Sequence, residues 1–178
     1  VNGGEHRAFA QSDSGAEAFT AGIRAFGDAT IVNSDTSGVS RNTSDFVNIQ
    51  LGATANGARV NGDAVVVGGR HSAEATVEQG GLIPSASGLV GFNSIDVQGA
   101  QINATASIEA SNVNNSSNAN GVYSDGNVTV NNSNIEISSI GNALSIFGPF
   151  FSNAGVNSGN QVIINNSSII ATNTVDLG

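Results

Sequence analysis

A repeat of about 33 residues constrains the fold of this chain more than any other feature of the sequence. Five segments share a small residue, a glycine, an apolar residue, a short polar turn and then alternating β-branched residues. The aligned glycines lie 35, 31, 33 and 34 residues apart and are Gly22, Gly57, Gly88, Gly121 and Gly155. The β-branched pairs behind them keep intervals of 35, 30, 33 and 34 and are Thr30/Val32, Val65/Val67, Ile95/Val97, Val128/Val130 and Val162/Ile164. A period of this length indicates a stacked repeat architecture.

Each repeat also contains further short runs that alternate with period two, as β-strands do. One run follows the β-branched pair, with its first inward position expected at Ser37, Ser72, Ile102, Ile135 and Ile169. The second inward position is expected at Val39, Glu74, Ala104, Ile137 and Ala171, where Glu74 indicates a local bulge or a wrong register. A third strand is expected at residues 47–51 and 144–146. Three strands per repeat and no convincing helical segment predict an all-β fold, a parallel β-solenoid of about five coils.

In such a solenoid each strand pairs with its equivalent one coil away, at about 4.8 Å. Asparagine and glycine pairs separate the strands, as expected for corners that require a positive φ. Stacked asparagines can hydrogen-bond through their side-chain amides. Asn131 over Asn165, and Asn132 over Asn166, are the predicted ladder positions.

The segment at residues 119–132, A-N-G-V-Y-S-D-G-N-V-T-V-N-N, carries the repeat most clearly. This pattern resembles the right-handed parallel β-helix of bacterial secreted proteins, with autotransporter passenger domains and related adhesins as the nearest relatives. The resemblance spans residues 21–177 and extends more weakly to extracellular fibre subunits. It implies a right-handed coil, in agreement with the general preference for right-handed crossovers. It also implies a secreted, extracellular or cell-surface protein of bacterial origin.

Charge excludes two classes of partner. The net charge is −9, with 14 acidic residues against five arginines and no lysine. Nucleic acid and anionic membranes both require a basic surface, so neither is expected as a partner. No apolar run approaches the roughly 20 residues of a membrane-spanning helix, so no membrane span is expected.

Cysteine and methionine are both absent, even at position 1. The absence of cysteine excludes disulfides, thiolate metal sites and cysteine nucleophiles. The absence of an initial methionine predicts a processed product or an excised piece of a longer chain. Together with abundant Asn, Ser and Gly, this composition is typical of bacterial surface or secreted proteins.

The sequence contains no motif that predicts catalysis. His6 and His71 are the only histidines, and His71 is expected to face solvent beside Arg70 at a corner. The nucleophile elbow G-x-S-x-G and the zinc motif H-E-x-x-H are absent. The chain is therefore not expected to be an enzyme, and no catalytic, cofactor-binding or metal-binding residue is predicted.

Acidic residues in the turns have two interpretations. Asp28 and Asp63 hold the same repeat position, taken in later copies by Asn93, Gly126 and Asn160. We interpret this set as a turn column whose side chains accept backbone N–H groups. The alternative is a polysaccharide-degrading enzyme, which would need two carboxyl groups about 5–10 Å apart and predicts a role for Asp63, Glu74 or Asp96. Calcium-binding repeats and EF-hand loops are absent from the sequence.

The ends of the solenoid carry the functional prediction. Residues 1–20 are expected to form an N-terminal cap or assembly segment, as a short helix at 15–19 or a strand at 7–10 with Phe9 as a plug, and residues 21–178 the repeats. Exposed strand edges at either end are templates for pairing with another chain. Aromatic and apolar residues near the two ends either plug the core or form a head-to-tail joint. The predicted assembly residues are Phe9, Phe19, Phe147, Phe150, Phe151, Val175 and Leu177.

These observations favour a secreted structural protein that assembles head to tail with itself into an extracellular or cell-surface filament, such as a biofilm-matrix or pilus-like fibre. An autotransporter or adhesin passenger segment that binds glycans or a host surface is the first alternative. The polysaccharide-degrading enzyme is the second. No cofactor is expected in the leading interpretation.

Overall fold

The computed structural model describes residues 1–13, 17–43, 52–78, 83–109, 115–142 and 149–176. All regular secondary structure in these ranges is β-strand. The first long sheet consists of β1 (Glu5–Ser12), β4 (Asp35–Asn42), β7 (Arg70–Val77), β10 (Gln101–Ile108), β13 (Asn134–Asn142) and β16 (Ser168–Asp176). The second long sheet consists of β2 (Ala18–Ala25), β5 (Ala53–Val60), β8 (Pro84–Gly91), β11 (Asn115–Ser124) and β14 (Pro149–Ser158). The short sheet consists of β3 (Ala29–Val32), β6 (Ala64–Val67), β9 (Ile95–Gln98), β12 (Val128–Asn131) and β15 (Val162–Asn165).

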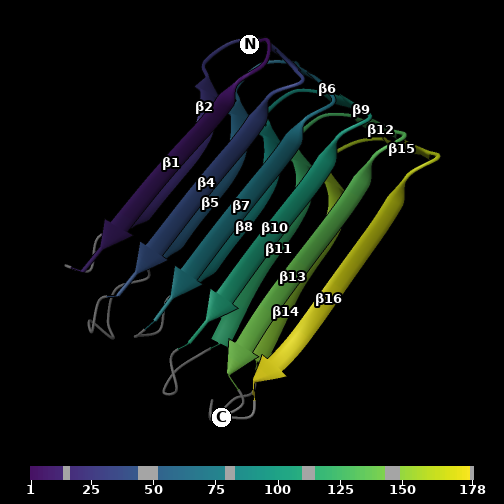
Figure 1. Ribbon diagram of the computed structural model, residues 1–178. Coiled ribbons are helices and arrows are strands. Elements are labelled where there is room, and N and C mark those ends of the chain that lie inside the picture. The colour runs from purple at the N-terminus through teal and green to yellow at the C-terminus, as the bar shows by residue number, and fades with distance from the viewer. Residues whose placement is uncertain (14–16, 44–51, 79–82, 110–114, 143–148, 177–178) are drawn as a thin grey trace.

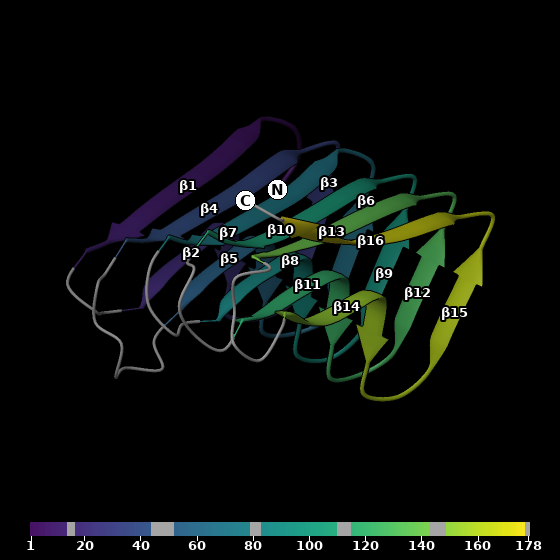
Figure 2. The ribbon, with the colours of Figure 1, turned by 90° about the horizontal axis from the view of Figure 1, so that it is seen from below.

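The chain visits the three sheets in turn, and each strand pairs in parallel with the equivalent strand of the next coil. Figure 1 shows the first long sheet in front, the second long sheet behind it and the short sheet along one edge. The view in Figure 2 shows the same flattened coil from a second direction. The all-β parallel solenoid with turns about 33 residues apart is confirmed. Five strands in each of the two smaller sheets are joined by four full turns, so there are roughly four coils rather than the predicted five.

The register of the first two coils differs from the predicted one by a single residue. Ile102 pairs with His71, and His71 pairs with Thr36, so the column of the predicted Ser37 and Ser72 lies on the outer face. In the short sheet Val66 is 1% exposed, whereas Val65 is 40% exposed and faces outward. Glu74 is likewise an outward residue and no bulge is needed to explain it, because Ala73 fills the inward position beside Ala104. A shift by one residue moves each side chain of a strand to the other face.

The size of the buried side chains differs between the two parts of the flattened coil. Near the short sheet it contains large β-branched side chains, among them Ile31, Val97, Ile102 and Ile135, all fully buried. Between the two long sheets many of the buried residues are small, with alanines at Ala53, Ala55, Ala75, Ala86, Ala104, Ala106 and Ala119. The small residues let the two sheets approach closely: a Cβ on Gly38 would lie 2.2 Å from the carbonyl oxygen of Asn56.

Three of the repeated glycines pack against a column of isoleucines on the inner face of the first long sheet. A Cβ on Gly88, Gly121 or Gly155 would lie 2.1–2.3 Å from the Cγ2 atom of an isoleucine in the same coil. The isoleucines are Ile102, Ile135 and Ile169. In these three coils the isoleucine occupies the space that a Cβ would need, whereas a Cβ on Gly22 or Gly57 would meet backbone atoms at 2.5–3.0 Å.

The corners between the short sheet and the first long sheet form one column of positive φ. The φ angles run from 46° to 68° at Gly3, Asn33, Gly68, Gly99, Asn132 and Asn166. Asparagine and glycine tolerate this conformation better than other residues. The predicted ladder is confirmed at Asn165, whose side-chain Nδ2 donates to Oδ1 of Asn131 at 2.9 Å.

The first residues of the chain also follow the coil pattern. Gly3 begins the corner column, and β1 pairs along its whole length with β4. A strand rather than a helix is thus found at residues 7–10, while Ala18 and Phe19 begin β2. The role of residues 1–20 as a cap or assembly segment stays a prediction.

Candidate functional site

The last described coil, formed by β14, β15 and β16 and called here the open coil, leaves its core face uncovered. Its inward positions are Val162, Ile164 and Ile169, which are 42%, 42% and 37% exposed. The residues directly beneath them are Val128, Val130 and Ile135, each 0% exposed. The same kinds of side chain are thus fully buried in one coil and exposed in the next, which is the last coil that the structure describes.

The edges of the open coil have protective residues only at Pro149, the first residue of β14, and Asp176, the last residue of β16. Natural edge strands are often protected by charges, prolines or a covering segment. The sequence contains no Asp, Glu, Lys or Arg between Glu136 and Asp176. The strands β14, β15 and β16 each lie at the end of their sheet. Apart from Asp176 at the end of β16, the open coil therefore combines free backbone edges with an uncharged, apolar core face.

The opposite end is partly covered. The N-terminal ammonium of Val1 donates to the carbonyl oxygen of Thr30 at 2.7 Å, and Gly3 N donates to Val32 O at 2.8 Å. These contacts place residues 1–3 along the edge of β3, where Ile31 is 0% exposed. The edges of β1 and β2 stay free at this end. The two ends are thus different surfaces on the same coil outline.

The predicted assembly residues do not gather at one place. Phe9 is 64% exposed on the outer face of β1, so it does not plug the core. Phe19 lies on the outer face of β2, whereas Phe151 is half-buried at an inward position of the open coil, paired with the buried Ser117. Val175 is 41% exposed in β16. Phe150 lies in β14, and Phe147 and Leu177 fall outside the described residues.

A side-chain cluster that the sequence analysis missed lies on the outer face of the second long sheet. We call it the Arg–Phe cluster, and its members are Phe19, Arg24, Phe26, Arg59 and Phe92. The guanidinium carbon of Arg24 lies 5.6 Å from the ring centre of Phe19 and 4.9 Å from that of Phe26. That of Arg59 lies 5.4 Å from Phe19 and 4.9 Å from Phe92. Cations and aromatic rings therefore alternate across three coils.

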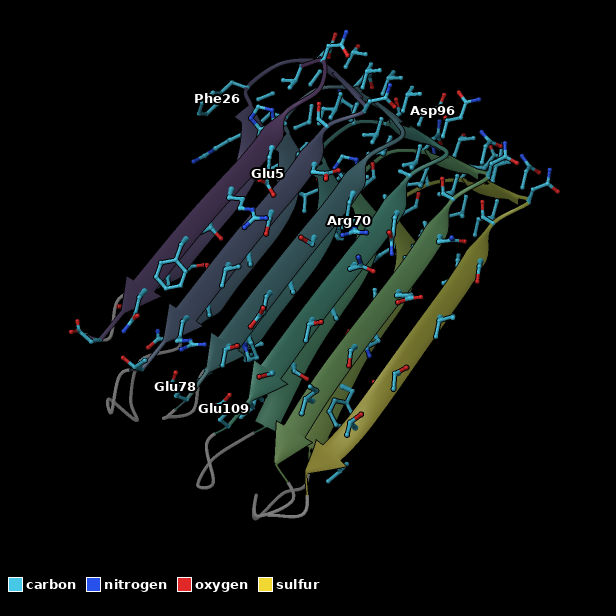
Figure 3. All side chains as sticks on the ribbon, in the orientation of Figure 1. Glu5, Phe26, Arg70, Glu78, Asp96 and Glu109 are labelled. Carbon is cyan, nitrogen blue, oxygen red and sulfur yellow. The ribbon has the colours of Figure 1, made fainter. Side chains whose placement is uncertain are left out.

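A shallow groove of about 410 Å³ lies on the outer face of the first long sheet. Its charged lining residues are Glu5, Arg7, Asp35 and Arg70, and each makes a polar contact within the protein. Arg7 pairs with Glu5, and the Asp35 carboxylate accepts the backbone N–H of Arg70 at 2.9 Å. Figure 3 shows Glu5 and Arg70 on this face. Arg70 Nε donates to the side-chain oxygen of Gln101 at 3.3 Å, so the Arg70 guanidinium is hydrogen-bonded but, among the described residues, not paired with a carboxylate.

His71 is fully buried, contrary to the expectation that it faces solvent. It lies in the inward column between Thr36 and Ile102 because of the one-residue register difference described above. Nδ1 of His71 and the Thr36 hydroxyl are 2.9 Å apart, and Nε2 lies 3.2 Å from the carbonyl oxygen of Gly68. Burial lowers the pKa of His71, opposed by the Gly68 hydrogen bond and the charge of Asp35. The imidazole serves as a satisfied core group rather than as an accessible base.

Acidification is therefore expected to destabilise the fold through His71. The folded state binds the proton less readily than the unfolded state, whose histidine pKa is about 6.5. The contribution of His71 to the free energy of unfolding is complete above that pH and is lost as the pH falls toward the lowered pKa of the folded state. Urea unfolding of the wild-type chain and of His71→Leu at a series of pH values measures this contribution. The free energy of unfolding should fall less steeply with decreasing pH in the variant than in the wild type. Equal slopes in the two proteins would contradict the assignment.

The carboxylates of the acidic turn column accept hydrogen bonds from backbone N–H groups, as predicted. The Asp28 carboxylate accepts the backbone N–H of Asp63 at 2.9 Å. The Asp63 carboxylate accepts the hydroxyl and the N–H of Ser94 at 2.6 and 3.0 Å, which lowers the pKa of Asp63. Hydrogen bonds place Ser94, Asn127 and Gln161 in this column, one residue after the predicted Asn93, Gly126 and Asn160.

Neither a metal-binding cluster nor a membrane-spanning helix is found in the part of the chain that the structure describes. Within the described ranges, no three His, Asp or Glu side chains are grouped closely enough to hold a metal ion. The described part of the chain contains no helix with the length and apolarity needed to cross a bilayer. Comparisons with protein-family models, curated proteins and solved structures find no match to this chain.

Proposed function

We propose that this chain is a secreted bacterial structural protein, a β-solenoid subunit that assembles head to tail into an extracellular or cell-surface filament. The observation that carries the proposal is the change in exposure between Ile135, at 0%, and Ile169, at 37%, one coil later. A second copy of the chain is the occupant that we assign to the open coil. The proposal assigns no catalysis to the protein.

Three properties of the open coil support a joint between copies. Its free strand edges can continue the parallel pairing that joins all the other coils. Its lack of charge avoids the cost of desolvating ions in the joint. Covering each of the inward side chains would contribute on the order of 1 kcal/mol to the free energy of association, because about 40% of each is exposed.

The N-terminal coil offers a matching surface. It has the same three-sided outline, since β1, β2 and β3 are the first strands of the three sheets. It differs from the open coil in its inward residues, which include the half-buried His6, Ala8 and Ala10. Contact between two different surfaces generates a closed ring or an open filament, and surfaces at the two opposite ends of a straight solenoid favour the filament.

Sedimentation velocity over a series of concentrations tests assembly of the 178-residue chain. We expect species larger than the 17.7 kDa monomer, with a size distribution that shifts upward as concentration rises. Electron microscopy of the same samples should show unbranched filaments. A monomer at every concentration would contradict the proposal, and so would a dimer that grows no further.

A glycan-binding adhesin segment is the second candidate function. The Arg–Phe cluster favours it, because aromatic rings and guanidinium groups together form a surface that can hold a polar ring. This function concerns the side of the solenoid and not its ends.

A further inference from the structure

The geometry of the Arg–Phe cluster points to a binding site for an acidic sugar residue, that is, a pyranose ring bearing a carboxylate, within an otherwise neutral glycan. The inference deepens the adhesin candidate and does not depend on filament formation. It rests on four features of the cluster: unpaired guanidinium groups, their mutual repulsion, their fixed positions and the spacing of the aromatic rings.

Arg24 and Arg59 have no anionic partner. Among the described residues, the only arginines in ion pairs with carboxylates are Arg7 and Arg41, with Glu5 and Glu78. The chain has 14 acidic residues for five arginines, so unpaired guanidinium groups are unexpected on its surface. Guanidinium binds carboxylates through two parallel N–H···O hydrogen bonds. The cluster therefore presents unused donors for a carboxylate.

The two arginines also occupy paired positions on adjacent strands. Arg24 and Arg59 are directly paired in the register of β2 and β5, so their backbones lie about 4.8 Å apart. Like charges in such a pair destabilise a sheet. Phe19 contacts both guanidinium groups and offsets part of this repulsion through its ring face. A bound anion between the two arginines would remove the rest.

Packing fixes these groups before any ligand arrives. The Nε atom of Arg59 is buried and has no hydrogen-bond partner, so this part of the side chain is packed against the protein. Each arginine lies over two aromatic rings. Ordering a long side chain on binding costs about 0.5–1.5 kcal/mol, and an arginine already held in place avoids most of that cost.

The aromatic rings define the length of the site. Phe26, Asn61 and Phe92 occupy the same position of three successive coils, as the backbone hydrogen bonds of Asn61 and Phe92 to the preceding coil show. Phe26 and Phe92 are thus two coil steps apart, about 9.6 Å, with a polar residue between them. They are 76% and 37% exposed, and Phe26 is labelled at the N-terminal end of the solenoid in Figure 3. This spacing suits one or two pyranose rings, whose C–H faces can contact the phenyl groups.

Neighbouring charges restrict the ligand further. Asp125 follows Phe92 in the same column and accepts the phenol of Tyr123 at 2.9 Å, which raises the pKa of Tyr123. This carboxylate repels a second anion beyond Phe92. The net charge of −9 opposes densely charged polymers, including nucleic acids, in favour of a glycan with isolated carboxylates.

Saturation-transfer difference NMR with D-glucuronate as the probe tests the site, and it works equally for monomers and filaments. We expect saturation of the ring protons of glucuronate but little for D-glucose, and displacement of glucuronate by inorganic sulfate only at much higher concentration. Absence of saturation with glucuronate, or equal responses to glucuronate and glucose, would overturn the inference. Equally effective displacement by sulfate would overturn the sugar component, because it would show a simple anion site.

Variants assign the response to the cluster. Arg24→Gln should weaken glucuronate binding about tenfold, since a hydrogen bond to a charged group is worth about 1.5–3 kcal/mol. Phe26→Ser should weaken it less, and both positions are exposed enough for the variants to fold. Arg70→Gln removes the same charge from the other long sheet and should leave binding unchanged. Equal affinity in Arg24→Gln and wild type would overturn the inference, while loss of filaments in any sample would bear only on the proposed function.

Discussion

Replacing Gly121 with alanine is expected to lower the free energy of unfolding by about 3 kcal/mol or more, near the upper end of overpacking effects. The new Cβ would lie 2.2 Å from Cγ2 of Ile135 and 2.5 Å from the carbonyl oxygen of Gly155. Ile135 is fully buried and the second contact is with backbone, so neither neighbour can move freely. Urea unfolding followed by circular dichroism measures the change.

Two other glycines serve as controls for this result. Gly27→Ala places its Cβ in open space and should change stability little or raise it slightly, because alanine restricts the unfolded chain. Gly155→Ala meets mainly the Cγ2 atom of Ile169, at 2.1 Å. Ile169 is 37% exposed in the open coil and can rotate away, so this variant should lose less stability than Gly121→Ala. Equal losses at Gly121 and Gly27 would contradict the packing explanation of the repeat.

A lysine at Ile164 is expected to abolish end-to-end assembly. Ile164 is 42% exposed and directly above the buried Val130, so a covering coil would have to bury the ammonium group. Burying an unpaired charge costs several kcal/mol, more than the apolar contacts of the joint return. In the free chain, the lysine can extend into water and leave the fold intact. Sedimentation velocity should find only monomers of Ile164→Lys.

The adjacent residue provides a matched control. Ile163 is 41% exposed, almost as much as Ile164, but it pairs with the outward Thr129 and faces away from the core. Ile163→Lys should therefore assemble as the wild type does. Assembly of Ile164→Lys, or equal inhibition by the two variants, would show that the core face of the open coil is not the joint. Thermal unfolding of both variants verifies that they fold.

The repeat itself was sufficient to predict the parallel solenoid, because only stacked coils place equivalent residues over one another. The one-residue error in the predicted register of the first two coils comes from the spacing between the second and third repeats. The predicted β-branched pairs were spaced 30 residues between the second and third copies, where the glycines were spaced 31. In the structure Thr36, His71 and Ile102 follow the glycine intervals of 35 and 31. Applying one set of intervals to all columns would have placed His71 in the core.

The Arg–Phe cluster could not be predicted in the same way. Its members are not repeated from coil to coil: the column that holds Arg24 and Arg59 continues with Val90 and Tyr123. Outward positions are under no common packing requirement, so their side chains carry no periodic signal. Only the folded structure, in which Phe19 lies within 5.6 Å of both guanidinium carbons, shows that these residues belong together. The aromatic residues were instead assigned to the ends from their positions in the sequence.

X-ray fibre diffraction from aligned assemblies tests most directly whether copies continue the solenoid end to end. If the open coil stacks on the first coil of the next copy, strands repeat along the filament axis and the reflection near 4.8 Å lies on the meridian. The account predicts this meridional reflection for the wild type and for Ile163→Lys. A 4.8 Å reflection on the equator would place the solenoid axes across the filament and contradict the account.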